Sequence, residues 1–447
     1  MFATEVFAAY AAEFRQAALD DEVLHHAKRA VVDWYAALFP GLAVAPVPQL
    51  HDLMQDELGQ GRARLADGRR ATARAAALIN GTAAHAAEVD DSFRDAMYHP
   101  GAATIAAALA AAQERGASGK DFLRGIVLGY EVSTRIGVVM GRPHYRFWHN
   151  TGTVGTFGAA AASAGLYGLG GLPFAHALAT AATFAAGLQQ AFRMDSMSKP
   201  LHAGRAAEAG LLAAQLAVRG VTGSLDVLDG DAGFGQAMGE DPDWSAVGQT
   251  LGKAFHIQRL TFKNHIGCGH TFAAIDGALA LMAAHGLRPG DVQRVHIATY
   301  GPALDIACHH DPRTETEAKF SLRYVVATAL VHGSVRLAAY TPERLQDPAT
   351  RAMMNRITVA VDPAIDAAFP ARRSARVEIE TVDGRRLVWL QPDRKGDPEL
   401  PLSDEELDGK FLELASPVLG TPAARALLGQ LWRLEGLADL QPLETRQ

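Results

Sequence analysis

The stretch VQRVHIATY at residues 292–300 decides the architecture, because it is the first clear β-strand after about 250 residues of helical sequence. Apolar and polar residues alternate along it and several are β-branched, which is typical of a half-buried strand. Further strands are expected at 357–361, 376–382 and 385–390. The last two flank Asp383-Gly384, a residue pair favoured in two-residue hairpin turns. These strands predict a sheet in the second half of the chain.

The sequence around these strands is typical of helices. Alanine, leucine and glutamate dominate residues 1–250 and β-branched runs are scarce, which favours helix. Helices are predicted at 4–19, 21–38, 102–114, 120–137, 152–168, 174–191, 201–218, 267–285, 317–332, 404–415 and 423–434.

We therefore predict a mainly α protein with an α+β part. Residues 1–264 would form a large all-helical domain, and residues 265–400 a smaller α+β lid domain. Helices at residues 401–447 would return to the helical domain. A chain of 447 residues is long enough for such a division, because single cores stop growing well below this length.

Composition and charge exclude several classes of protein. Hydrophobic residues make up 49% and charged residues 20%, which is ordinary for a soluble globular protein. The net charge of -7 argues against nucleic acid or an anionic membrane as a partner. Two cysteines, Cys268 and Cys308, are too few for a disulfide scaffold. Residues 1–16 lack the basic start of a signal peptide and no apolar run is of spanning length, so we expect a cytoplasmic protein.

Common signatures of cofactor and hydrolase chemistry are missing from the sequence. It contains no Walker A loop, no GxGxxG after a strand, no HExxH and no GxSxG. Nucleotide chemistry, zinc hydrolysis and serine acyl transfer are therefore disfavoured.

An acidic segment, EVDDS at residues 88–92, is followed by His99. Its three carboxylates repel one another, and such crowding survives on a solvated loop or where a shifted pKa is used. Glu88, Ser92 and His99 are thus candidate site residues. The alternative is a solvated cap before the helix at 102, with His99 as a capping or core histidine.

Polar and aromatic side chains precede a glycine-rich helix start at residues 144–158, HYRFWHNTGTVGTFG. Glycines at three-residue spacing let a ligand or another helix approach the backbone, and the N-terminus of a helix favours an anion. This pattern makes Tyr145 and His149 candidates. Tight helix packing, with both as ordinary boundary residues, is the alternative.

A basic segment lies at residues 193–205, RMDSMSKPLHAGR, between two apolar helices of an acidic protein. Arg193 and Arg205 offer forked donors suited to carboxylates, and His202 adds an imidazole. Burial among like charges would depress the pKa of Lys199, which would make it a base near neutral pH. The alternative is a solvated, charged linker.

Two further segments follow the domain junction. In KNHIGCGH, residues 263–270, two histidines and a cysteine could bind a metal, but no fourth ligand is evident. Neutral histidines lining a polar cleft, among them His270, are the preferred interpretation, and no metal is predicted. In EAKFSLRY, residues 317–324, Tyr324 is a core tyrosine or a site residue.

In this order, the segments resemble the MmgE/PrpD family, which includes 2-methylcitrate dehydratases, cis-aconitate decarboxylases and iminodisuccinate epimerases. The resemblance rests on HPGAAT, HNTGTVGTFGAAAA, SKPLHAGRAAEAG and EAKFSLRYVVATAL and covers essentially the whole chain. It implies a helical domain with an α+β lid, an active site between them, a homodimer, and no metal or organic cofactor. It further implies functional roles for Glu88, Ser92, His99, His149, Lys199, Tyr324 and His270.

Within the family, the sequence favours the iminodisuccinate epimerase branch. Tyr145, four residues before His149, is similar to a tyrosine that pairs with the Lys-Pro lysine there, and Glu88 replaces the aspartate of the decarboxylases. Tyr145 and Lys199 would exchange a proton α to a carboxylate of a small di- or tricarboxylate. Arg193, Arg205 and His149 would stabilise the charge that develops.

Two alternatives stay open. A lyase, either a dehydratase or a decarboxylase, would use the same base with His99 or His149 as general acid. A non-catalytic carboxylate-binding protein would bind the same ligands without exchange of the α-proton.

Overall fold

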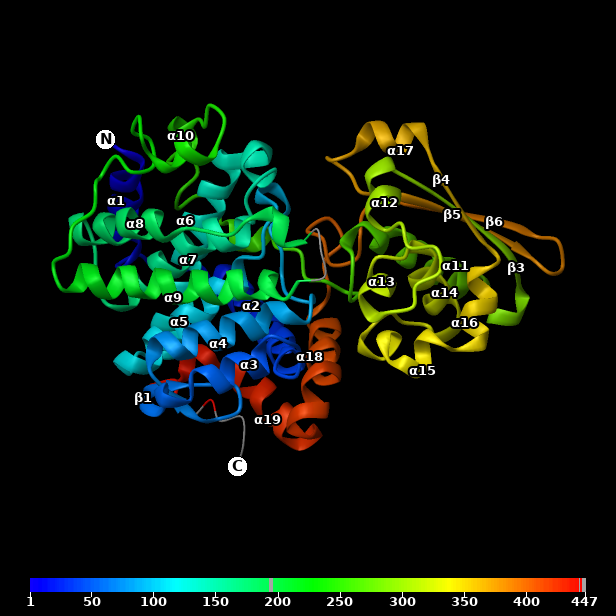
Figure 1. The fold of residues 1–447 in the computed structure, drawn as a ribbon, viewed down its shortest axis with the longest axis horizontal. Helices are drawn as coiled ribbons and strands as arrows, with labels where there is room; N and C mark the ends of the chain where they lie inside the picture. The colour runs from blue at the N-terminus through cyan, green and yellow to red at the C-terminus, as the bar shows by residue number, and fades with distance from the viewer. Residues whose placement is uncertain (193–195, 442, 444–447) are drawn as a thin grey trace. The chain divides into compact units, whose positions relative to one another are not determined.

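The computed structural model describes residues 1–192, 196–441 and 443. The chain divides into two compact units: unit 1 consists of residues 1–262 and 403–447, and unit 2 of residues 263–402. Unit 1 is helical apart from one hairpin, and unit 2 combines a four-stranded sheet with helices (Figure 1). The predicted fold class, mainly α with an α+β part, is confirmed.

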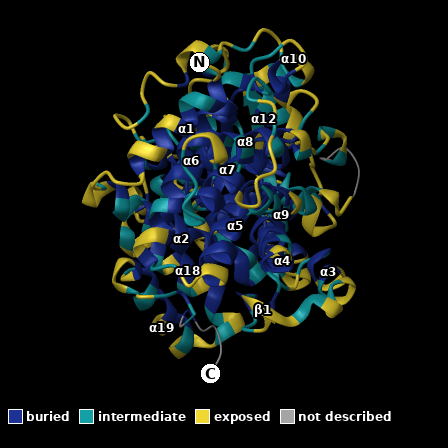
Figure 2. Ribbon diagram, turned by 90° about the vertical axis from the view of Figure 1, so that its left-hand side faces the viewer, coloured by how far each residue is buried: buried dark blue, intermediate teal, exposed yellow. Residues whose placement is uncertain are grey.

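The helices of unit 1 surround a buried central helix, α7 (Asn150–Leu166) (Figures 1 and 2). The others are α1 (Ala3–Phe14), α2 (Asp21–Gly41), α3 (Val47–Leu53), α4 (Ala73–Ala86), α5 (Pro100–Arg115), α6 (Gly119–Tyr145), α8 (Leu172–Phe184), α9 (Ser198–Val218), α10 (Phe234–Met238), α18 (Asp404–Leu419) and α19 (Thr421–Leu431).

Small side chains let these helices pack closely. Helix α7 lies against α5, α6 and α9, and every residue from 150 to 164 is buried. A Cβ atom at Gly210 of α9 would lie 2.5 Å from the carbonyl oxygen of Thr156 in α7, too close for any side chain. Glycine and alanine at these contacts set how closely the helices, and therefore their ends, approach one another.

Three local expectations differ from the structure. The domain predicted as all-helical contains an antiparallel hairpin of β1 (Leu58–Arg64) and β2 (Arg70–Ala71), whose glycines and arginines carry no strand signal. Helix α9 begins at Ser198, before Pro200, because proline is tolerated in the first turn. Helix α6 continues past 137 to Tyr145, through a break at Gly141, where φ is +55°.

Unit 2 is built on a sheet with strand order β4-β3-β5-β6. Strand β3 (Val292–Thr299) pairs in parallel with β4 (Ile357–Val361) and antiparallel with β5 (Ala375–Thr381), which pairs antiparallel with β6 (Arg386–Gln391). Helix α11 (Phe272–His285) packs on β5 and β6 and against α14 (Leu322–His332). The shorter helices are α12 (Gly301–Ile306), α13 (Glu315–Lys319), α15 (Pro342–Leu345), α16 (Pro348–Met354) and α17 (Pro363–Ala368).

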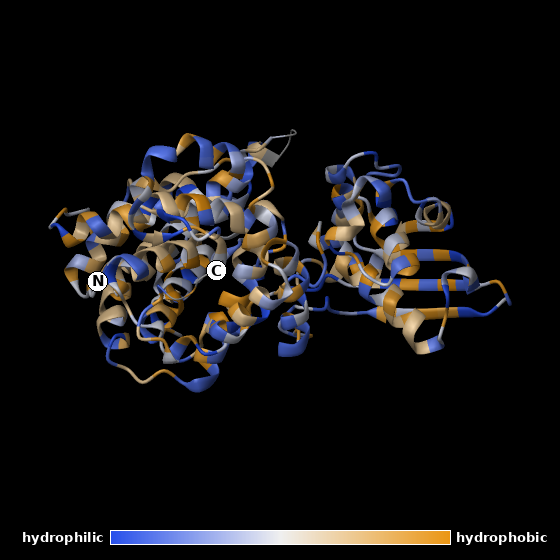
Figure 3. Ribbon diagram, turned by 90° about the horizontal axis from the view of Figure 1, so that it is seen from below, coloured by the Kyte–Doolittle hydropathy of each residue, from blue (hydrophilic) through white to orange (hydrophobic). Residues whose placement is uncertain are grey.

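Alternation along β5 sets the core of unit 2. Val377 and Ile379 are buried while Arg376 and Glu380 are exposed, so one face of the strand packs inward. Figure 3 shows both hydrophobic and hydrophilic segments along the strands of unit 2. Among the described residues, no helix is both long and apolar enough to cross a membrane.

Candidate active site

The candidate site lies where the ends of four helices of unit 1 meet. His85 is in the last turn of α4, His99 precedes α5, His149 precedes α7 and Lys199 is the second residue of α9. Three helix N-termini thus lie together, because these helices pack pairwise along their lengths. Unsatisfied backbone N–H groups and the helix dipoles make such a place attractive for anions.

Four histidines and one aspartate form a connected group, which we call the histidine cluster: His85, Asp90, His99, His149 and His202. The ring centroid of His85 lies 4.8 Å from that of His99 and 5.6 Å from that of His149. Nδ1 of His149 lies 3.0 Å from Nδ1 of His202. Nδ1 of His85 is 2.8 Å from Oδ2 of Asp90.

Burial keeps the imidazoles of His149 and His202 uncharged at neutral pH. Desolvation lowers the pKa of His149 well below its ordinary value, and the neighbouring His85 and Lys199 lower it further. Desolvation also lowers the pKa of His202, with His85 and Lys199 contributing. A neutral imidazole offers one nitrogen as a hydrogen-bond donor and the other as an acceptor, so it can take up a proton as a general base.

Lys199 and Glu88 form an ion pair beside the cluster. Both side chains are about a quarter exposed, so a ligand can reach them. Glu88 has φ of +59° and Met97 φ of +52°, a region that non-glycine residues rarely adopt. The loop is held by a backbone bridge between Ser92 and Thr261. Strained backbone at both ends of one loop is typical of a functional site.

A second layer of buried polar groups supports the loop. The carboxyl group of Asp91 accepts hydrogen bonds from the Tyr130 hydroxyl at 2.7 Å and from the Gly101 N–H at 3.0 Å. Lys410 of α18 donates to Asp33 at 2.5 Å and to the carbonyl oxygen of Val89 at 2.8 Å. The loop is therefore fixed by three helices besides those that carry the histidines.

The contacts within the histidine cluster are those of a hydrogen-bonded network. His85, Asp90 and His99 are the group of described residues that could offer three ligand atoms, all within 4.8 Å of one another. However, Nδ1 of His99 lies 2.7 Å from the carbonyl oxygen of Asp91, and Nδ1 of His85 faces Asp90. Nitrogens that donate hydrogen bonds carry protons and are not ligands. The geometry favours a hydrogen-bonded network.

The structure brings five of the predicted residues together: Glu88, His99, His149, Lys199 and His202. Ser92 belongs to the same loop and pairs through its backbone. Tyr145 ends α6 and is 37% exposed, and the guanidinium of Arg205 contacts Glu208 in its own helix. Arg193 lies outside the described residues.

Two predicted residues belong to unit 2. Nδ1 of His270 lies 2.9 Å from the hydroxyl of Tyr300, and burial lowers the pKa of His270 to about 3, with Arg373 and Arg394 contributing. Tyr324 is buried, and its hydroxyl donates to the carbonyl oxygen of Ala339.

Sequence reasoning missed His85 and the part played by Asp90. His85 stands in an alanine-rich helix, where a single histidine looks like a core residue. The available signal was its spacing: His85 lies in the last turn of a helix, five residues before an aspartate of the acidic loop.

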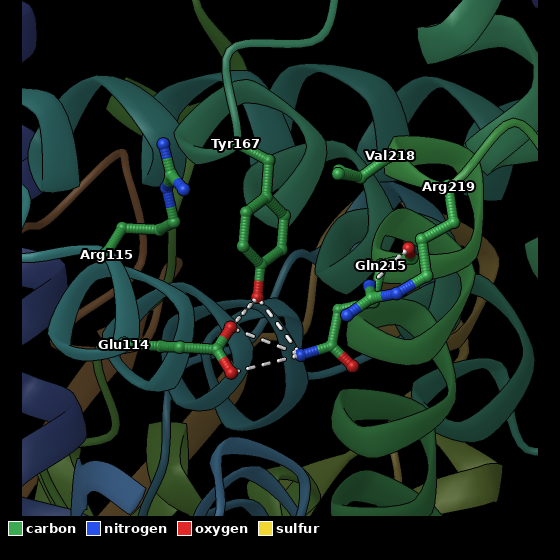
Figure 4. Close-up of a pocket in the computed structure, with 6 residues that line it drawn as sticks. All are labelled: Glu114, Arg115, Tyr167, Gln215, Val218 and Arg219. Atoms are coloured by element: carbon green, nitrogen blue, oxygen red, sulfur yellow. Dashed lines mark hydrogen bonds between the residues drawn. The ribbon is translucent and has the colours of Figure 1, made fainter.

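A separate hollow of about 260 Å³ lies at the opposite, C-terminal ends of α5, α7 and α9 (Figure 4). In it, Glu114 accepts hydrogen bonds from Tyr167 and Gln215, and Arg115 and Arg219 flank them. Burial, together with the hydrogen bond to Glu114, raises the pKa of Tyr167 far above its ordinary value. The hydroxyl of Tyr167 therefore stays protonated near neutral pH.

Known protein families match both units. Residues 5–247 match the MmgE/PrpD N-terminal domain, and residues 265–434 match the MmgE/PrpD C-terminal domain. The chain belongs to the MmgE/PrpD family. The predicted family is thereby confirmed over most of the chain.

Within the MmgE/PrpD family, several relatives are named lyases. A cis-aconitate decarboxylase-like protein, oryM, of Aspergillus oryzae is 28% identical over 458 residues, 96% of this chain and 94% of its own. The cis-aconitate decarboxylase of Homo sapiens is 27% identical over 461 residues, 99% of this chain and 94% of its own. A 2-methylcitrate dehydratase of Salmonella typhimurium is 29% identical over 125 residues, 26% of each chain.

Proposed function

We propose that this MmgE/PrpD protein is a lyase that removes CO2 from a small unsaturated tricarboxylate of the cis-aconitate type. Two relatives named for cis-aconitate decarboxylation match it over 94% of their length, whereas the dehydratase matches over 26%. The observation that carries the proposal is the set of three helix N-termini beside Lys199 and four imidazoles. It combines anion binding with acid–base groups.

The proposed reaction breaks one C–C bond and consumes one proton. The bond to a carboxylate breaks, CO2 leaves, and its electron pair forms a new double bond. The pair of the old double bond moves to the carbon beside another carboxylate. Lys199 and the helix N-termini would hold the carboxylates and stabilise this charge. His99 or His149 would then give that carbon its proton.

The relatives support this lyase better than the epimerase expected from the sequence. An epimerase needs two groups on opposite faces of one carbon, and Tyr145, the expected partner of Lys199, lies at the exposed end of α6. A homodimer and a cytoplasmic location stay predictions of the sequence.

Proton NMR in D2O tests the proposal, with cis-aconitate, 2-methylcitrate and iminodisuccinate offered separately. We expect cis-aconitate alone to yield one CO2 and a dicarboxylate carrying one deuteron. Lys199→Met should reduce this turnover by on the order of 10²-fold or more. Lys120→Met, at an exposed position of α6, is the matched control and should not. Loss of only the α-proton of iminodisuccinate would establish the epimerase instead.

A further inference from the structure

Asp90 lies buried between two imidazoles of the histidine cluster. Only 1% of it is exposed, and its Oδ2 is 2.8 Å from Nδ1 of His85 and 3.4 Å from Nδ1 of His99. A buried carboxylate is costly unless donors surround it, so both ring nitrogens are expected to carry a proton toward it. One oxygen atom thus faces two histidines.

The partners of the two rings determine their tautomers. Nδ1 of His99 is 2.7 Å from the carbonyl oxygen of Asp91, which can only accept, so this nitrogen carries the proton. Nδ1 of His85 faces a carboxylate and carries a proton for the same reason. In the tautomer protonated at Nδ1, Nε2 of His85 is the ring nitrogen that can accept a hydrogen bond.

Nε2 of His85 is an acceptor that the protein leaves unused. It is fully buried and has no hydrogen-bond partner among the described residues. Buried polar atoms are nearly always paired, so an unpaired one is a candidate to bind a ligand or a water molecule. The ring of His85 lies 4.8 Å from that of His99 and 5.6 Å from that of His149, nearly parallel to the latter at 27°. Nε2 of His85 is thus next to the other imidazoles of the histidine cluster.

We propose that Asp90 is a positioning residue that holds His85 in the tautomer protonated at Nδ1, so that Nε2 of His85 accepts a hydrogen bond from the substrate. This inference rests on the proposed function for its reaction, but the tautomer can be observed without any substrate. A carboxylate behind a histidine holds the ring in one orientation and keeps the proton on the nitrogen that faces it. The Nδ1 proton of His99 is held mainly by the carbonyl oxygen of Asp91, at 2.7 Å against 3.4 Å to Asp90.

Asp90→Asn tests the proposal with almost no change of shape. An amide keeps an acceptor oxygen but carries no negative charge, so it holds the proton on Nδ1 of His85 less strongly than a carboxylate does. We expect kcat to fall by on the order of 10²-fold, with KM changed less than threefold. Asp95→Asn, in the same loop but at a surface ion pair with Arg259, is the matched control and should keep kcat. Asp90→Glu restores the charge and should recover part of kcat.

A second variant separates positioning from folding. His85→Asn keeps a side-chain N–H near the place of Nδ1, so that Asp90 stays paired, but it removes Nε2. We expect it to fold, as judged by an unchanged Tm, and to lose kcat as Asp90→Asn does. Full activity in His85→Asn would overturn the assignment of Nε2.

Side-chain 15N NMR of histidine-labelled protein gives the substrate-free reading. The signal absent from His85→Asn belongs to His85, and in the wild-type protein it should show the tautomer protonated at Nδ1. In Asp90→Asn this signal should shift toward the other tautomer. An unchanged tautomer together with lost activity would show that Asp90 is merely structural. If the wild-type protein turns over no substrate, the proposed function fails, and these spectra still decide the role of Asp90.

Discussion

At the scale of the residue, Asp91 couples stability to pH. It is buried, and desolvation, with a contribution from Asp33, raises its pKa to about 8. An unfolded chain releases this proton near pH 4, whereas the folded protein keeps it up to about pH 8. The folded state binds more protons in that window, so the contribution of Asp91 to stability falls as pH rises through it.

Asp91→Asn should therefore become relatively more stable than the wild-type protein as pH rises. The amide needs no proton to stay neutral. The variant therefore does not show the decrease in the free energy of unfolding, at most about 1.4 kcal/mol for each pH unit in the window, that Asp91 causes in the wild-type protein. Thermal unfolding of both proteins at pH 5, 7 and 9 and constant ionic strength measures the difference. A Tm difference that is the same at all three pH values would contradict the assignment.

Most side chains of the candidate site could be found from the sequence, but their contacts could not. Glu88, His99, His149 and Lys199 stood out because polar groups crowd just before helix starts. His85 did not, because its partners among the described residues come from the loop and from other helices. The left-handed backbone of Glu88 is likewise imposed by tertiary contacts, since glutamate has no local preference for it.

At the scale of the element, α18 connects the C-terminal segment to the site loop. It packs on α2, and Lys410 reaches from it to Asp33 of α2 and to the carbonyl oxygen of Val89, next to Glu88. Both charged side chains are at most 1% exposed. Neither charge is tolerable alone at this depth.

Lys410→Met should destabilise the protein by about 3–5 kcal/mol, because it removes the cationic partner of the buried Asp33 carboxylate. The double variant Asp33→Asn/Lys410→Met should recover most of that loss, since neither charge of this pair stays buried. Urea unfolding of the wild-type protein, both single variants and the double variant measures the coupling. Equal losses in Lys410→Met and the double variant would show that the ion pair has no role in stability.

The type of an element could be predicted where one local sequence signal dominated. The ends of an element could be predicted where a proline or glycine interrupted the pattern. Helix α5 begins at Pro100, and β5 and β6 flank Asp383-Gly384, as the sequence indicates. The hairpin β1–β2 was not predictable, because its pairing depends on glycines at positive φ rather than on strand formers. Local propensity is a weak guide wherever packing selects the backbone.

At the scale of the whole molecule, the candidate residues are divided between the two units. The histidine cluster belongs to unit 1, whereas His270 belongs to unit 2. His270 is neutral at working pH, because burial lowers its pKa to about 3. A neutral imidazole fixed to Tyr300 is suited to hydrogen-bond a substrate rather than to pair with its charge.

His270→Asn should lower kcat/KM by about 10-fold or more, the usual cost of a lost hydrogen bond to a charged group. Asparagine can keep the hydrogen bond to Tyr300, so unit 2 should retain its Tm. His285→Asn, at the exposed end of α11, is the matched control. Steady-state kinetics on the substrate identified by NMR gives the measurement. Full activity in His270→Asn would contradict a substrate contact at this residue.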